Sequence, residues 1–369
     1  MAGDIVRHNN TPSDFEQMGV VWKYEILKYV RSKRLFATLA IVGIILALIY
    51  LVPLYFDGYN GTDSDVVLLP FSAGIMEMTP SGPDDAQFVA FIDRDTIEPD
   101  TIEVFIGGEL YPSLDGANWV YLNAEIEGDT HNVLLFMVGE DVAGHDISTT
   151  YDWHVSAESF DSNFISFVSI LIIICSVAFA ADSLVGEFQS RTGYLIFPNA
   201  IKRETLFAGK FMASITMGMV VVGLFYIVVA VLSMISASGV DDDFLVSFGF
   251  AAGFVFAAMG IAYLISAIMK GSTGAIVFTF FLLLMILPIV DSVTMVVGAK
   301  VEGSVTFAAS AIVYVLMDPY PEDSMIDVGT MEFHNYYPTP STAAIVLVVY
   351  TLVSCLLSAI IFKRKQLAG

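Results

Sequence analysis

Six long stretches without an ionisable side chain dominate the pattern of this sequence. A helix that crosses a bilayer needs about 20 mostly apolar residues, because it rises about 1.5 Å per residue through a hydrocarbon core about 30 Å thick. A single soluble core has no use for so many such stretches. The pattern therefore predicts a polytopic all-α membrane protein with six transmembrane helices, over residues 35–56, 164–181, 211–237, 244–269, 274–290 and 343–362.

A seventh uncharged stretch, residues 303–317, lies in the segment 291–342 between the last two spans. It is too short to cross the membrane comfortably, and counting it as a span would move the basic cluster 363–365 to the opposite side. We therefore expect an interfacial or re-entrant helix here. Asp291, at the end of span five, is expected to be hydrated rather than part of an ion pathway.

The composition excludes an ordinary soluble protein, because 56% of the residues are hydrophobic and only 15% are charged. Both cysteines, Cys175 and Cys355, fall inside predicted spans. A disulfide framework for a secreted domain would have no function there, so we expect both to be apolar core residues.

The lysines and arginines are segregated with respect to these spans. Fourteen of the sixteen fall on the side that carries both termini, and only Arg94 and Lys300 fall on the other. Cytoplasmic loops of membrane proteins carry an excess of lysine and arginine. We therefore expect a multi-pass protein of the plasma membrane with both termini in the cytoplasm.

Residues 1–34 form the predicted cytoplasmic N-terminus, in which an amphipathic helix precedes span one. A basic helix with an aromatic stripe lies naturally in the membrane interface, so we expect an elbow helix there. The alternative is a plain basic flank that only orients span one. The apolar arc comprises Phe15, Trp22, Ile26, Tyr29 and Val30, and the charged arc comprises Lys23, Glu25, Lys28, Arg31 and Arg34. The residues expected to contact the interface are Trp22, Lys23, Lys28 and Arg31.

Residues 57–161, between spans one and two, form a predicted extracellular domain with 22 acidic residues and the single base Arg94. Short runs with period-two alternation, separated by glycine-rich turns, are typical of a β-sandwich. Residues 97–155 also resemble the immunoglobulin-like repeats of surface proteins. Strands are predicted over residues 86–92, 101–106, 118–126, 132–138 and 148–155.

Three aspartates of this domain, Asp93, Asp95 and Asp100, are closely spaced oxygen ligands of the kind that calcium prefers. No EF-hand loop surrounds them. They are therefore only weak metal candidates, and we expect a solvated acidic face instead.

The loop between spans two and three, residues 182–208, has a helix-break-helix pattern. Glu187 and Arg191 are four residues apart and share one helix face, while Thr192-Gly193 and Pro198 interrupt the helix. The pattern predicts a short helix across the exit of span two, on which a partner protein could push. The alternative is a solvated loop whose charges only determine the topology.

The run from Glu187 to Gly209-Lys210, with Thr192-Gly193, Pro198 and Lys202-Arg203 between them, resembles the signature of type-two ABC exporter membrane subunits. The basic elbow, large external insertion, six spans and basic tail extend the resemblance over nearly the whole chain. It implies the permease subunit of an exporter, working as a homodimer or as a heterodimer with a similar chain. It also implies that residues 187–198 are a coupling helix that docks on a separate cytoplasmic ABC ATPase. The ATPase-coupling residues assigned in this way are Glu187, Arg191, Thr192, Gly193, Pro198 and Arg203.

No nucleotide site is expected on this chain. Where a Walker A loop needs its first glycine and its hydroxyl, the sequence around Gly209-Lys210 has Glu204 and Phe211. We therefore expect a non-catalytic subunit without a cofactor, with ATP and magnesium on the partner, and no nucleic-acid partner. Two other functions remain open. One is a multi-span surface adhesion or receptor protein that uses the β-sandwich, and the other is an intramembrane enzyme, which the missing nucleophile and metal motifs disfavour.

Overall fold

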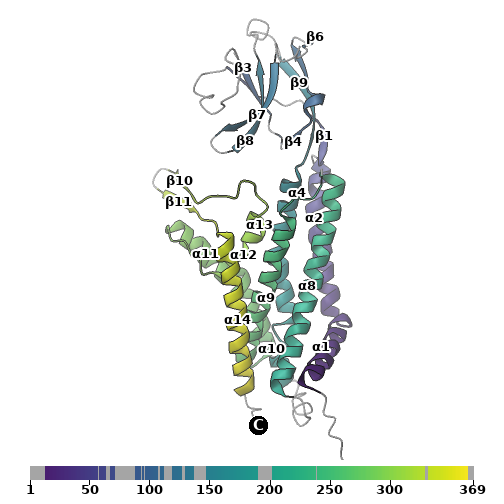
Figure 1. Ribbon diagram of the computed structural model, residues 1–369, viewed down its shortest axis with the longest axis vertical. Coiled ribbons are helices and arrows are strands. Elements are labelled where there is room, and N and C mark those ends of the chain that lie inside the picture. Colours follow the sequence, from purple (N-terminus) through teal and green to yellow (C-terminus); the bar gives the residue numbers. More distant parts are fainter. Residues whose placement is uncertain are drawn as a thin grey trace, which may run out of the picture. The chain divides into compact units, whose positions relative to one another are not determined.

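The structure is a computed structural model (Figure 1). It describes residues 13–364, apart from residues 57, 64–66, 71–87, 93, 95, 107–108, 112–118, 127–128, 137–146, 190–201, 238 and 329–330. The chain divides into two compact units. The first comprises residues 1–48, 161–230 and 241–369, and the second comprises residues 49–160 and 231–240.

Among the described residues, six helical segments are long and apolar enough to cross a membrane. Each covers one of the predicted spans to within two residues at its end, so the expectation of a polytopic helical membrane protein is confirmed. The segments are α2 (Lys33–Phe56), α4 (Ala157–Ile165) with α5 (Val168–Phe179), α8 (Arg203–Ser236), α9 (Phe244–Ile268), α10 (Ser272–Phe281) with η3 (Leu282–Ile286) and α11 (Leu287–Val296), and α14 (Pro340–Arg364).

Helix α9 lies at the centre of the first unit, where it contacts α5, α10 and α14. Small residues bring α9 and α14 close together. A Cβ atom on Gly253 would lie 3.3 Å from Leu347, and one on Gly260 would lie 3.2 Å from Ser354. Small residues at a helix interface are typical of membrane helices, which associate through close packing rather than through the hydrophobic effect.

Two further helices of the first unit lie next to spans in the chain, one before α2 and one after α5. Helix α1 (Asp14–Val30) begins with a capping box, in which Ser13 and Glu16 each accept a hydrogen bond from the other's backbone N–H. Helix α6 (Val185–Gln189) follows α5 and is the first part of the predicted loop. The helix predicted before span one is therefore present.

The second unit contains two antiparallel sheets. The five strands predicted from the sequence are all present, as β3 (Phe88–Ile92), β5 (Glu103–Ile106), β7 (Trp119–Ile126), β8 (Asp129–Phe136) and β9 (Ile147–His154). The additional strands are β1 (Asn60–Asp63), β2 (Val67–Pro70), β4 (Thr96–Ile97) and β6 (Glu109–Leu110). One sheet has the order β1-β9-β5-β6, with β4 also on β9, and the other has the order β2-β3-β8-β7.

Both sheets contribute to one buried apolar cluster, which holds the unit together. Val104, Tyr151 and Trp153 come from the first sheet, and Trp119 and Leu134 come from the second. The alternation predicted for the last strand is correct, because Tyr151 and Trp153 face this cluster. An immunoglobulin-like topology for these sheets stays a prediction.

The segment between α11 and α14 was only partly predicted. Residues 303–317 contain two short helices, α12 (Val305–Ala309) and α13 (Ala311–Tyr314), and their interfacial or re-entrant character stays a prediction. A hairpin of β10 (Ser324–Val328) and β11 (Met331–Asn335) follows and was not predicted. Its signal in the sequence is the Gly-Thr pair between two β-prone runs.

The expectation that Asp291 is hydrated is wrong. The residue is only 8% exposed, and its Oδ2 accepts a hydrogen bond of 2.5 Å from the Thr306 hydroxyl. Helices α11 and α12 pack against each other and bring the two residues together. The sequence did not indicate this contact because it depends on how the segment after the span folds back.

Candidate functional site around Lys210

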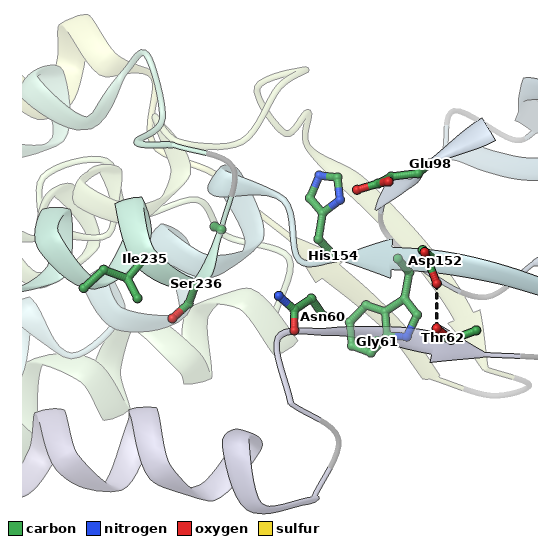
Figure 2. Close-up of a pocket in the computed structure, with 10 residues that line it drawn as sticks. Asn60, Gly61, Thr62, Glu98, Asp152, His154, Ile235 and Ser236 are labelled. Atoms are coloured by element: carbon green, nitrogen blue, oxygen red, sulfur yellow. Dashed lines mark hydrogen bonds between the residues drawn. The ribbon is translucent and has the colours of Figure 1, made fainter. Parts of the chain in front are cut away.

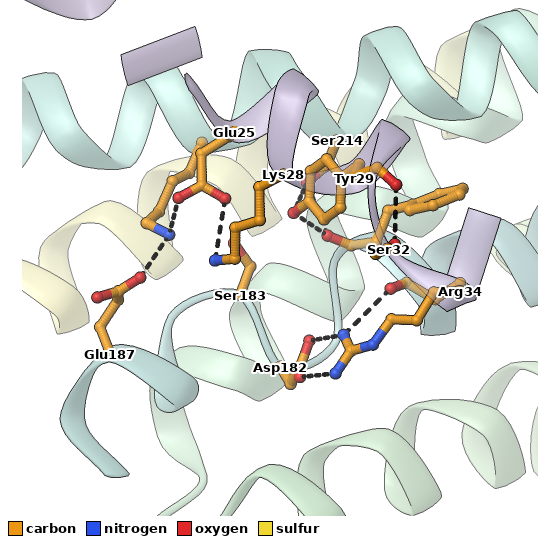
Figure 3. A network of polar contacts seen from close by, with 12 residues as sticks. Glu25, Lys28, Tyr29, Ser32, Arg34, Asp182, Ser183, Glu187 and Ser214 are labelled. Carbon is orange, nitrogen blue, oxygen red and sulfur yellow. Dashed lines mark hydrogen bonds and ion pairs between the residues drawn. The ribbon is translucent and has the colours of Figure 1, made fainter. Parts of the chain in front are cut away.

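A buried lysine near the start of α8 pairs with carboxylates of two other helices. Figure 3 shows these two carboxylates, Glu25 and Glu187. Lys210 of α8 is 1% exposed. Its Nζ lies 2.6 Å from Oε1 of Glu25 in α1 and 2.7 Å from Oε1 of Glu187 in α6. Both carboxylates are buried as well. We call Glu25, Lys210 and Glu187 the ion triad.

The ion triad has one positive and two negative charges, and a fourth residue balances them. The exposed Lys28 places its Nζ 3.3 Å from Oε2 of Glu25. A buried charge without a partner is costly, whereas a buried pair with further hydrogen bonds is tolerated. Lys210 can therefore lie within α8 because α1 and α6 each supply a carboxylate to it.

Gly209 allows α1 to approach α8 closely enough for this contact. A Cβ atom at position 209 would lie 2.7 Å from Cγ1 of Val21 and 3.0 Å from the carbonyl oxygen of Met18. Any side chain would therefore push α1 away. Val21, Glu25 and Tyr29 are four residues apart and form the stripe of α1 that is buried against its neighbours.

A chain of hydroxyl groups lies beside the ion triad. The Tyr29 hydroxyl donates to the carbonyl oxygen of Phe179 at 2.7 Å, and the Ser214 hydroxyl donates to the same oxygen at 2.8 Å. The hydroxyl of Tyr263 in α9 lies 2.9 Å from those of Ser214 and Ser183. Burial raises the pKa of Tyr29 above its ordinary value, so it remains a protonated donor.

The start of α6 is held by α9 and α2. The Ser266 hydroxyl accepts hydrogen bonds of 3.1 Å from the backbone N–H groups of both Leu184 and Val185, which the helix itself cannot satisfy. The Arg34 guanidinium binds both carboxylate oxygens of Asp182, at 2.8 and 2.7 Å. Bidentate pairs of this kind constrain the orientation of both groups.

The structure corrects the expected orientation of Glu187. The coupling assignment implied that this side chain faces a partner, but it is buried against Lys210. The reason is that α8 begins at Arg203 rather than at residue 211, so Lys210 lies inside the bundle and needs a counter-charge. A role of Glu187 in coupling stays a prediction.

The other predicted loop residues are only partly described. Arg191, Thr192, Gly193 and Pro198 lie outside the described residues. Arg203 is half-buried at the start of α8, and its guanidinium donates to the carbonyl oxygen of Lys363 at 3.2 Å. The coupling roles assigned to all of these residues stay predictions.

The predicted arcs of the elbow helix are also partly wrong. Glu25 was assigned to the charged outer arc but lies in the buried stripe, because it pairs with Lys210. Trp22 is 38% exposed, and its indole N–H donates to the Thr216 hydroxyl at 3.1 Å. Lys23, Lys28 and Arg31 are exposed, as expected for residues at an interface.

The weak metal candidates gain no support. Asp93 and Asp95 lie outside the described residues, and Asp100 is exposed in a short 3₁₀ turn. No group of three histidine, cysteine, aspartate or glutamate residues suited to a metal was found in the part of the chain that the structure describes.

The second unit has an open pocket of about 480 Å³ (Figure 2). Polar side chains of β1 and β9 line it, among them Asn60, Thr62, Asp152 and His154. Asp152 already accepts a hydrogen bond of 2.6 Å from the Thr62 hydroxyl. The lining contains no cysteine, lysine or arginine, and we assign no chemistry to this pocket.

The comparison with known proteins supports the interpretation of the chain as a membrane protein of a transporter. No curated protein matches the chain. The sequence model of the ABC-2 family transporter proteins matches residues 19–367, which is nearly the whole chain. The match includes the ion triad, all six candidate spans, the β-rich unit and most of α1. The protein therefore belongs to the ABC-2 family of transporter proteins.

Proposed function

We propose that this chain is the permease subunit of an ATP-driven exporter, and that a separate cytoplasmic ATPase docks on residues 183–204. The chain acts in the plasma membrane, with both termini in the cytoplasm, as a homodimer or with a similar permease. ATP and magnesium bind to the ATPase, because the sequence around Gly209-Lys210 departs from a Walker A loop at two of its four defining positions, the first glycine and the hydroxyl.

The observation that carries the proposal is the way in which α6 is attached to the spans. Ser266 of α9, Lys210 of α8 and, through Asp182, Arg34 of α2 each hold residues 182–187. A force on the loop that follows α6 is therefore passed to three spans at once. A loop that only determined topology would need none of these contacts.

The β-rich unit is best explained as an accessory domain of the transporter, with an immunoglobulin-like sandwich as its proposed class. A surface adhesion or receptor protein would need only one anchor, whereas this chain has six candidate spans. Membership of the ABC-2 family likewise favours transport.

Affinity capture tests the proposal. The tagged full chain is solubilised from the membranes of its own host, and the copurifying proteins are identified by mass spectrometry. We expect a protein with a Walker A motif and ATPase activity in the eluate. Replacing residues 190–198 by a glycine-serine segment of equal length should abolish its recovery, and the same replacement of residues 329–330 should not. Equal recovery from both variants would contradict docking at this loop.

The proposed orientation is tested by labelling single cysteines on intact cells with an impermeant thiol reagent, in a background without Cys175 and Cys355. Cysteines at positions 120 and 330 should react, and cysteines at positions 195 and 366 should react only after the cells are opened. The reverse pattern would overturn the orientation that we derive from the segregated basic residues.

A further inference from the structure

We infer that Lys210 is a positioning residue that joins the elbow helix α1 and residues 179–189 into one moving body. This inference rests on the proposed function, because it concerns how a force on the loop reaches span one. According to this inference, α1 moves together with the loop and the spans that transmit force from the ATPase. The basic sequence of α1 by itself indicates only a contact with the membrane surface.

Buried charges join α1 to residues 179–189 through Lys210. Glu25 and Glu187 share one ammonium group, at 2.6 and 2.7 Å. If α6 moved away alone, Glu187 would leave Lys210 with a single partner, or would itself remain buried without a counter-charge. Either outcome is unfavourable in a region of low polarity, so the lowest-cost motion keeps all three residues together.

The attachment of α1 and the start of α2 to the exit of span two is repeated at three places. Phe179 accepts from Tyr29, Asp182 binds Arg34, and Glu187 is joined to Glu25 through Lys210. All three partners, residues 25, 29 and 34, come from α1 or the first turn of α2. A single contact could act as a pivot, but three contacts over this length prevent rotation as well as separation.

Close packing also holds α1 against α8. Gly209 leaves α1 in direct contact with the backbone of α8, because a Cβ atom there would lie 2.8 Å from Cβ of Val21. Closely packed surfaces do not slide continuously but move between discrete arrangements. Val21, which meets Gly209, and Tyr29, which begins the hydroxyl chain to Tyr263, each lie one helical turn from Glu25 in α1.

Hydrogen exchange of the full chain in nanodiscs tests whether the two segments open as one. In Lys210→Met, the amides of α1 and of residues 179–189 should both exchange about tenfold faster or more, by similar factors. The matched control is Lys202→Met, which removes an exposed pair with Asp14 just before the start of the same helix and should change neither segment. Acceleration of only one segment, or of neither, would overturn the inference.

A second variant distinguishes a positioning role of Lys210 from a general unfolding of the protein when Lys210 is replaced. In the triple variant Glu25→Gln, Lys210→Met, Glu187→Gln no charge of the triad is left buried, so the fold should be retained. In the captured complex with its ATPase, ATP with vanadate should change exchange in residues 179–189 and in α1 of the wild type. In the triple variant the response of α1 should be clearly smaller than in the wild type while that of residues 179–189 is unchanged, because only the contacts of Tyr29 and Arg34 remain.

The two proposals fail in different ways. If no ATPase is captured, the proposed function fails, but the exchange of the nucleotide-free chain still decides whether Lys210 joins the two segments. If the ATPase is captured and α1 responds equally in the wild type and in the triple variant, docking stands and the positioning role of Lys210 is wrong.

Discussion

Lys210 in the first unit and Arg94 in the second are both basic side chains that pair with carboxylates, but they differ in burial and in the elements that they join. Lys210 is fully buried and pairs with carboxylates from two other helices. Arg94 is 29% exposed, pairs with Asp63 at 2.5 Å and lies 4.1 Å above the ring of Trp153. Arg94 therefore stabilises the neighbouring strands β1 and β9 of one domain, whereas Lys210 joins the separate helices α1, α6 and α8.

The comparison predicts that the largest loss of stability follows from removing Lys210. Lys210→Met leaves two buried carboxylates without a counter-charge, and breaking a buried pair in this way costs about 3 to 5 kcal/mol. Denaturant unfolding of the purified protein should show this loss. The triple variant with both glutamates changed to glutamine should recover most of it. A Lys210→Met protein as stable as the wild type would contradict the role of the ion triad.

Gly209 should be the next most sensitive position. In Gly209→Ala the new methyl group would collide with Val21, and overpacking of this kind costs about 1 to 3 kcal/mol. A Cβ atom on Gly223, in the same helix, would meet no neighbouring group within 4 Å. Gly223→Ala should therefore be neutral or stabilising by up to about 1 kcal/mol, because alanine is the better helix former. A Gly209→Ala protein at least as stable as the wild type would show that α1 does not depend on close contact at Gly209.

Loss of Arg94 should have a smaller and local effect. Arg94→Met removes a cation–π contact and a partly exposed ion pair, which together are worth about 1 to 2 kcal/mol. Trp153 fluorescence should report an earlier transition of the β-rich unit. The transition of the helical unit, followed by circular dichroism, should be unchanged. A common shift of both transitions would show that the stabilising effect of Arg94 is not confined to the β-rich unit.

The smallest effect is expected for Lys202. Its pair with Asp14 is exposed, and the hydrogen bond with that carboxylate raises the pKa of Lys202 above its ordinary value. Exposed ion pairs contribute little, because water and salt screen both charges. Lys202→Met should therefore unfold at the same denaturant concentration as the wild type within experimental error. A clear loss would show that this pair takes part in holding α1.

Much of this architecture could be predicted from the sequence, because it depends on local periodicity. The uncharged stretches indicate the spans, and the alternation that ends in Tyr151 and Trp153 indicates a strand. The hairpin around Gly329-Thr330 was missed although its turn pair is visible. It was missed because the neighbouring uncharged stretch favoured a helical interpretation.

The ion triad could not be predicted, because it depends on contacts between residues far apart in the chain. Nothing near Glu25 indicates that it pairs with Lys210, and an exposed charge is the more common state of a glutamate in an amphipathic helix. Two signals were nevertheless present. Glu25 falls at the same spacing as Val21 and Tyr29, and a glycine directly precedes Lys210. They indicate close packing of each helix, but neither identifies Lys210 as the partner of Glu25.

The central claim is that an ATPase docks on the loop after α6, and site-specific photo-crosslinking tests it most directly. Glu187 is unsuitable for this test, because changing it also removes a partner of Lys210. A photoreactive amino acid is instead placed at position 195, or at position 330 as the matched control, in the full chain in its own host. The account predicts a crosslink to a protein with a Walker A motif from position 195 and none from position 330. Crosslinks to such a protein from position 330, or from neither position while it still copurifies, would contradict it.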